Sequence, residues 1–149
     1  YAVDLKGVFP IGRLDKDSHG LIILTNDGRI TDKLLNPDYV HEKEYLVTTK
    51  TKLRSNFKEK MESGVHIEGY MTRPCKVHIV NDLTFRIILT EGKKRQIRRM
   101  TEANHHQVID LKRIRIMNIE LDKIPQGSFR EIKGKELDEL LTLLKLSLV

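Results

Sequence analysis

The chain has 149 residues, of which 39% are hydrophobic and 32% charged, and its formal net charge is +6. This length and composition indicate one globular domain with a hydrophobic core and exclude a disordered or fibrous chain. No apolar run approaches the roughly 18 residues that span a bilayer, so no membrane segment is expected. The single cysteine excludes an internal disulfide and a Cys-rich zinc site, which indicates a reducing cytoplasm.

Hydrophobic periodicity and turn residues divide the chain into predicted strands and helices. Residues 1–8 have no clear pattern, Asn26–Gly28 has the composition of a turn, and Asn36–Pro37 is typical of a helix end. In chain order, the patterns predict a strand at 20–25, a helix at 30–35, a strand at 44–49, a short helix that starts at 57 and ends at Gly64, strands at 65–67, 75–80 and 84–90, a helix at 95–104, a strand-rich segment at 108–121 and a helix at 135–148.

The order of these segments favours an α+β fold with a largely antiparallel sheet, because strands and helices do not alternate as they do in βαβ units. Asn81–Asp82 predicts a hairpin turn between the strands 75–80 and 84–90. The leucine stripe of residues 135–148 is expected to pack on the core rather than on a membrane.

Basic residues are concentrated in two short stretches of the sequence. The first stretch holds Lys93, Lys94, Arg95, Arg98 and Arg99, and the second holds Lys112, Arg113 and Arg115. One such stretch is as often a solvated protein face as a nucleic-acid surface. Two stretches close together favour an RNA or DNA surface.

The most unusual stretch is the loop Gly12–Leu21, in which Asp15 and Asp17 lie among basic residues. The spacing leaves three interpretations open: a solvated turn whose charges pair, a metal loop in which His19 joins both carboxylates, or a carboxylate nucleophile kept ionised by neighbouring Arg and Lys. The metal loop is the weakest of these, because it lacks the Glu and the Gly placing of a calcium loop and no further ligand pattern follows.

Other candidate reactive residues have simpler structural interpretations. His105 and His106 are adjacent, so their side chains point to different sides and chelate one metal poorly; we interpret them as a polar helix end. Cys75 is interpreted as a buried or half-buried strand thiol rather than a nucleophile. The sequence has no P-loop, dinucleotide-binding glycine motif or serine elbow, which argues against phosphate-cradling and serine-hydrolase chemistry.

Four segments carry motifs that occur together, in this order, in one family of RNA-modifying enzymes. They are the Arg-Leu-Asp loop Gly12–Gly28, the Lys-x-Tyr segment His41–Val47, the Gly-x-x-x-Gln-Ile-Arg segment Glu91–Met100, and Leu111–Asn118 followed by Pro125, Gly127 and Arg130. Together they resemble the RsuA-type RNA pseudouridine synthases, near the F-type branch of the enzymes for large-subunit ribosomal RNA, and they cover nearly the whole chain.

The resemblance implies the pseudouridine synthase fold, which is α+β with a mixed, mostly antiparallel sheet flanked by helices. It implies an enzyme that isomerises a specific uridine, in 23S (large-subunit) ribosomal RNA or, as a second candidate, in tRNA. No metal and no organic cofactor are implied. The expected partner is therefore RNA, with no membrane, and the expected state is a monomer.

The resemblance also implies roles for single residues. Asp15 is the implied nucleophile, Tyr45 stacks on the target base and is the candidate for removing its C5 proton, and Arg98 pairs with the Asp15 carboxylate. Ile97 packs on the base, and Arg13 takes part in displacing the target nucleotide. Lys93, Lys94, Arg95 and Arg99 are expected to hold phosphates. Attack at C6, attack at C1′ and elimination at C2′ stay open.

Strand alternation adds a geometric expectation for Tyr45. Tyr45, Val47 and Thr49 share one face of their strand and Leu46 lies on the other, so Tyr45 faces the cleft if Leu46 faces the core. Arg98 is then expected to form a charge-assisted pair with Asp15.

Two features of the sequence bear on the whole protein. Members of this branch usually carry an N-terminal S4-type RNA-binding domain and a first strand with an Asn-Lys-Pro motif, and neither precedes Tyr1. Residues 1–149 are therefore expected to be a catalytic domain taken from a longer protein. Two rival functions remain: a non-catalytic RNA-binding module of ribosome assembly, which explains the basic stretches alone, and a metal-dependent nuclease using Asp15 and Asp17.

Overall fold

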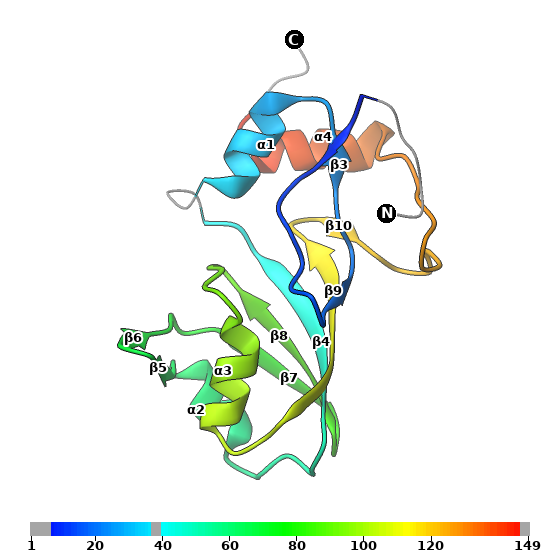
Figure 1. Ribbon diagram of the computed structural model, residues 1–149. Helices are drawn as coiled ribbons and strands as arrows, with labels where there is room; N and C mark the ends of the chain where they lie inside the picture. The colour runs from blue at the N-terminus through cyan, green and yellow to red at the C-terminus, as the bar shows by residue number, and fades with distance from the viewer. Residues whose placement is uncertain (1–6, 37–39, 147–149) are drawn as a thin grey trace.

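The computed structural model describes residues 7–36 and 40–146 of the chain, and these residues form an α+β fold (Figure 1). The strands are β1 (Phe9–Pro10), β2 (His19–Gly20), β3 (Leu24–Thr25), β4 (Lys43–Thr49), β5 (His66–Ile67), β6 (Tyr70–Met71), β7 (Lys76–Asn81), β8 (Thr84–Leu89), β9 (Val108–Ile116) and β10 (Ile119–Glu120), and the helices are α1 (Gly28–Leu35), α2 (Phe57–Glu62), α3 (Gln96–Ala103) and α4 (Gly134–Leu143).

The central sheet has the order β10-β9-β4-β8-β7, and every neighbouring pair in it is antiparallel. β2 adds a short parallel pair to β9, so the sheet is mixed but mostly antiparallel, as predicted. The predicted hairpin between β7 and β8 is present, with Asp82 and Leu83 as its turn.

The buried hydrophobic residues form two cores. In the first core, Phe57 of α2 and Met100 of α3 pack against inward-facing residues of the sheet such as Phe85. The Phe57 and Phe85 rings meet edge to face with their centroids 4.9 Å apart. The second core joins α1, α4 and the residues around β2 and β3, and Ile116 and Ile119 contribute to it. β4 and β9 run between the two halves and hold them in one domain.

The apolar residues 20–25 do not form the single buried strand that was predicted. The chain changes partner within them: Leu21 N donates to Arg113 O on β9 at 2.8 Å, whereas Ile23 O accepts from Ile11 N beside β1 at 2.8 Å. The result is two strands of two residues each, β2 and β3, separated by three residues outside any strand. The segment is buried as predicted, because Leu21 and Ile23 both belong to the second core.

Smaller differences occur where short pairings or turns decide the structure. β1 and β6, with two residues each, were not predicted, and the predicted strand-rich segment 108–121 is a hairpin of β9 and β10. α4 spans Gly134–Leu143, shorter than the predicted helix at 135–148, whose last two residues lie outside the described residues. Residues 1–6 and Pro37 also lie outside them.

Candidate active site

The Arg-Leu-Asp loop lies between β1 and β2 and is fixed at its C-terminal end. Gly20 pairs with Arg113 of β9, and Arg113 Nε donates to Leu21 O at 2.8 Å. Within the loop, Ser18 N donates to Asp15 O at 2.9 Å and closes a turn. Asp15 is exposed on this turn, and no described side chain lies within hydrogen-bond or ion-pair distance of its carboxylate.

Arg98 reaches this loop, but its partner is Asp17 rather than the predicted Asp15. Arg98 Nη2 donates to the backbone oxygen of Asp17 at 2.7 Å, and Nη1 lies 3.8 Å from the Asp17 carboxylate. Arg95 donates to the same carboxylate through both terminal nitrogens, at 3.1 and 3.4 Å. The hydrogen bond from Arg95 is the main reason that the pKa of Asp17 is lowered. Asp17 therefore connects the loop to α3 through its contacts with Arg95 and Arg98.

Asp15 lies close enough to Arg95 for their charges to interact. The pKa of Arg95 is raised, mainly by its hydrogen bond to Asp17 and, to a smaller degree, by the charges of Asp17 and Asp15. The two arginines thus hold the loop, and Arg95 brings positive charge near the exposed Asp15 carboxylate.

The three side chains of the Gln-Ile-Arg motif contact three different parts of the structure. Gln96 is buried and joins the preceding loop, because its Nε2 donates to Glu91 and its Oε1 accepts from Lys93 N at 3.1 Å. Ile97 is 5% exposed and belongs to the first core, and Arg98 points toward the Asp17 loop. The sequence patterns indicated no role for Gln96 or Glu91, although the Gln of the motif was the available signal.

Glu91 connects this motif to the β5–β6 hairpin. Its carboxylate accepts from Tyr70 Oη and from Arg73 N, in addition to Gln96. Burial raises the pKa of Glu91, but these hydrogen bonds outweigh burial and lower the pKa overall. The loop before α3 is therefore anchored on both sides, which fixes Arg95 and Arg98 at the start of the helix.

Tyr45 lies on the core face of β4, so the condition under which it was expected to face the cleft, Leu46 on the core face, is not met. Val47 and Thr49 are fully buried on the same face, and Tyr45 is half-buried at the edge of the first core, to which Ile97 also belongs. A β-bulge between Glu44 and Tyr45 shifts the register there and places Tyr45 opposite Arg113 on β9. That Tyr45 faces Asp15 across one cleft stays a prediction.

The basic residues of the two stretches do not form one open patch. In the first stretch, Lys94 is exposed, Lys93 Nζ lies 4.5 Å from the centre of the Tyr70 ring, and Arg99 pairs with Glu68 at 3.3 Å. Arg13, on the Arg-Leu-Asp loop, is also exposed. In the second stretch, Arg113 is buried and Arg115 pairs with Glu42 and Glu44. The second stretch is therefore mostly structural, because the strand pattern of β9 points its basic residues to different surroundings.

The metal-loop interpretation finds no support in the described residues. His19 Nε2 contacts Asp110 Oδ1 at 2.8 Å instead of joining Asp15 and Asp17, and the described residues contain no cluster of three His, Cys, Asp or Glu side chains suited to a metal. His106 is buried against the Phe57 ring and bonds Thr51 and Arg54, so it is a structural residue beyond the end of α3. Burial lowers the pKa of His106. Within the described residues, no helix is long and apolar enough to cross a membrane.

Cys75 is expected to be a slow nucleophile. Its thiol donates to Met61 O at 3.3 Å, and burial, followed by the charges of Glu62 and Glu91, raises its pKa to about 11. Because the thiolate is the reacting form, alkylation by iodoacetamide at pH 8 should be roughly a hundredfold slower than for free cysteine. Mass spectrometry over a time course measures this rate, and labelling as fast as free cysteine in the folded protein would contradict the structural role.

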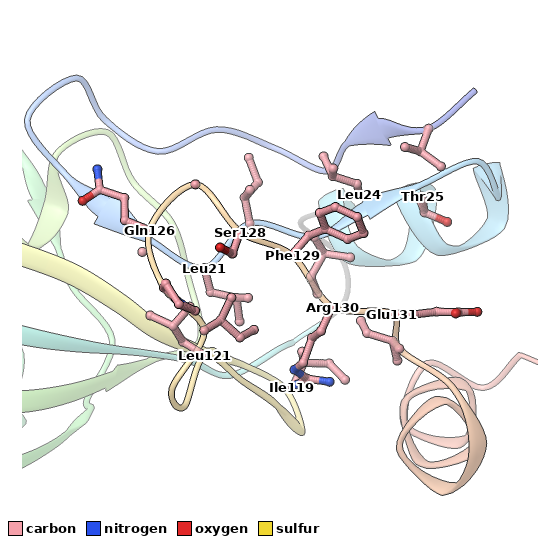
Figure 2. Close-up of a pocket in the computed structure, with 18 of the residues that line it drawn as sticks. Leu21, Leu24, Thr25, Ile119, Leu121, Gln126, Ser128, Phe129, Arg130 and Glu131 are labelled. Atoms are coloured by element: carbon pink, nitrogen blue, oxygen red, sulfur yellow. The ribbon is translucent and has the colours of Figure 1, made fainter. Parts of the chain in front are cut away.

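A cavity of about 850 Å³ is lined by none of Asp15, Asp17, Arg95 and Arg98 (Figure 2). It is bounded by Leu21 to Thr25 on one side and by the loop of Pro125 to Ile132 on the other, and Figure 2 shows Leu121 and Phe129 among its apolar side chains. A second cavity of about 50 Å³ adjoins the Arg-Leu-Asp loop and is lined by Arg13, Lys43 and Arg113 together with apolar residues.

Similarity to known proteins identifies the family of this chain. The RNA pseudouridylate synthase family matches residues 3–103, and the chain belongs to this family. A solved structure described as a pseudouridylate synthase superposes with a TM-score of 0.87 at 30% identity, covering 93% of this chain and 63% of that one. The predicted pseudouridine synthase fold is thus confirmed.

Curated relatives give a narrower comparison. The chain is 48% identical over 140 residues to the dual-specificity RNA pseudouridine synthase RluF of Escherichia coli K12, covering 94% of this chain and 48% of the relative. It is 35% identical over 142 residues to the ribosomal large subunit pseudouridine synthase B of Bacillus subtilis, covering 91% and 58%. The chain therefore spans about half the length of the curated relatives it matches.

Proposed function

We propose that this chain is the catalytic domain of an RNA pseudouridine synthase that isomerises a uridine in large-subunit ribosomal RNA, with a tRNA uridine as the second candidate. The observation that carries the proposal is an exposed Asp15, paired with no described side chain, on a loop that Arg95 and Arg98 clamp through Asp17. The similarity to the dual-specificity synthase and to the large-subunit synthase supports the choice of substrates. A cytoplasmic location and a monomeric state stay predictions.

The chemistry assigns each group a task. The bond between C1′ of the ribose and N1 of uracil breaks, the base turns, and C1′ bonds to C5. The C5 proton leaves and N1 gains one, so no atom is added or lost. Asp15 is the nucleophile of this cycle, and its exposure leaves it free to meet a base that has left the RNA stack. Tyr45 offers a ring for stacking, which offsets part of the cost of unstacking.

Mapping of pseudouridine in ribosomal RNA and tRNA tests this proposal. RNA from cells with and without the full-length protein is compared, and a site that loses pseudouridine in the deletion and regains it with the wild-type gene identifies the substrate. An unchanged map, together with retained RNA binding by the purified protein, would favour the non-catalytic RNA-binding module instead. The expected S4-type domain before residue 1 stays a prediction for the full-length protein.

Turnover is expected to survive metal chelation. Asp15 and Asp17 share no described third ligand, and Asp17 is already held by two arginines, so neither carboxylate is arranged for a metal. On a short RNA whose own fold needs no Mg²⁺, EDTA should leave the rate of pseudouridine formation within about twofold of the untreated rate. A loss that Mn²⁺ or Zn²⁺ restores, or RNA cleavage with the metal added, would favour the nuclease.

A further inference from the structure

The cavity of about 50 Å³ beside the Arg-Leu-Asp loop has an unusual lining. Its charged residues are three bases, Arg13, Lys43 and Arg113, and no carboxylate is among the residues that line it. The rest of the lining is Ile11, Gly12, Ile23, Leu34, Leu35 and Ile116. Arg113 is buried and Lys43 half-buried here, and their two positive charges against an apolar wall are unfavourable unless something negative joins them.

Arg113 is the deepest of the three bases. It is 5% exposed, and its Nε donates to Leu21 O at 2.8 Å. Its Nη2 is buried and has no hydrogen-bond partner among the described protein atoms. A buried guanidinium nitrogen without a partner is uncommon, because a buried donor that loses water without gaining an acceptor destabilises the fold.

The side chain of Lys43 is half-buried and makes no hydrogen bond or ion pair within the described residues. Burial and, after it, the charge of Arg113 lower its pKa, in keeping with two cations that no nearby carboxylate compensates. The acidic residues on either side are already engaged: Glu42 and Glu44 both bind Arg115, at 3.3 and 2.8 Å. The carboxylates of Glu42 and Glu44 therefore bind Arg115, whereas Lys43 lines the cavity.

The charged residues of the cavity are also close, in sequence or in strand register, to the two groups proposed for catalysis. Arg13 precedes Asp15 by two residues, and Lys43 precedes Tyr45 by two residues in the Lys-x-Tyr motif. Arg113 stands opposite Tyr45 in the register of β4 and β9. A ligand group held here would therefore sit next to the base that Asp15 and Tyr45 handle.

We propose that Arg13, Lys43 and Arg113 form a site for one phosphate group of the RNA backbone, next to the uridine that is isomerised. The proposal rests on the proposed function and deepens it. A volume of about 50 Å³ is small and is of the order that one tetrahedral anion needs. A water molecule would satisfy Arg113 Nη2 but would leave the charges uncompensated, whereas a phosphate oxygen does both.

The site is tested first with inorganic phosphate, which needs no knowledge of the target RNA. The full-length protein, labelled with ¹⁵N-arginine, is titrated with phosphate at constant ionic strength, and the Nε signal of Arg113 is followed. It should shift and saturate. Lys43→Met should weaken this binding at least tenfold and Lys43→Arg should restore it. The matched control, Lys76→Met on the edge strand β7, should change it less than twofold. An unmoved Arg113 signal, or equal effects of Lys43→Met and Lys76→Met, would overturn the site.

A second measurement separates RNA phosphate from a free anion. Binding of the full-length protein is measured for RNAs in which one linkage at a time around the target uridine is a neutral methylphosphonate. The neutral linkage at one position should weaken RNA binding by the wild-type protein about tenfold. The same linkage should have no further effect on binding by Lys43→Met. The affinity of Lys43→Met for unmodified RNA should also depend less steeply on salt, by about one charge. Phosphate binding without any such position would mean that the pocket takes a free anion, and the RNA assignment would fall. This assay measures RNA binding and not turnover. A failure of the phosphate site can therefore be distinguished from a failure of the proposed pseudouridine synthase activity.

Discussion

Asp15→Asn is expected to lower pseudouridine formation by on the order of 10⁴-fold or more, with the fold unchanged. The carboxylate makes no hydrogen bond or ion pair with a described side chain, so an amide of nearly the same shape costs the structure little. The backbone oxygen of Asp15, which accepts from Ser18 N, is kept in the variant. What is lost is the nucleophile, since an amide attacks neither the ring nor the ribose.

Asp17→Asn is the matched control, because it removes the same charge two residues away. This carboxylate binds Arg95 and lies 3.8 Å from Arg98, but the strongest contact of Arg98 is to the Asp17 backbone oxygen, which the variant retains. We expect a smaller fall in turnover, on the order of tenfold, from a less firmly held loop. Single-turnover formation of pseudouridine, followed by mass spectrometry, measures both variants. Wild-type turnover by Asp15→Asn, or an equal loss in Asp17→Asn, would move the nucleophile away from Asp15.

Elements with a long, regular pattern could be predicted from the sequence. The alternating residues 44–49 correspond to β4 at Lys43–Thr49, and the predicted helix at 95–104 corresponds to α3 at Gln96–Ala103. The strand prediction for residues 20–25 failed because an apolar run states only that a segment is buried. Which neighbour each backbone group bonds depends on the positions of β1 and β9, which come from distant parts of the chain.

The candidate site shows the same division. The motifs predicted that Arg98 would reach the loop, and it does, but the turn closed by Ser18 presents Asp17 rather than Asp15 to the guanidinium. The spacing of residues in the sequence does not determine the conformation of a loop. It therefore could not predict whether Arg98 would contact Asp15 or Asp17. For Tyr45, alternation correctly grouped it with Val47, but the choice of core face depends on α2 and α3, which cover that face from elsewhere in the sequence.

Gly20→Ala is expected to destabilise the domain by roughly 2–5 kcal/mol, the larger of the two structural effects foreseen at glycines. Gly20 has φ of 115°, where residues with a side chain rarely occur. A Cβ at this position would lie 2.3 Å from Arg113 O and 2.6 Å from Arg113 N, and these are backbone atoms of β9 that cannot rotate away. The strand pair would have to separate, which would also release the end of the Arg-Leu-Asp loop.

Gly28→Ala supplies the comparison, because Gly28 begins α1, would have no described atom within 4 Å of an added Cβ and does not need a positive φ. Alanine there should leave stability equal or raise it by about 0.5 kcal/mol, through the smaller entropy of the unfolded chain. Thermal unfolding of the full-length protein should show a midpoint lowered by roughly 5–15 °C in Gly20→Ala and unchanged or slightly raised in Gly28→Ala. Turnover should fall in Gly20→Ala even well below its midpoint, because the loop that carries Asp15 loses its anchor on Arg113. A Gly20→Ala variant as stable and as active as wild type would mean that β2 does not approach β9 this closely.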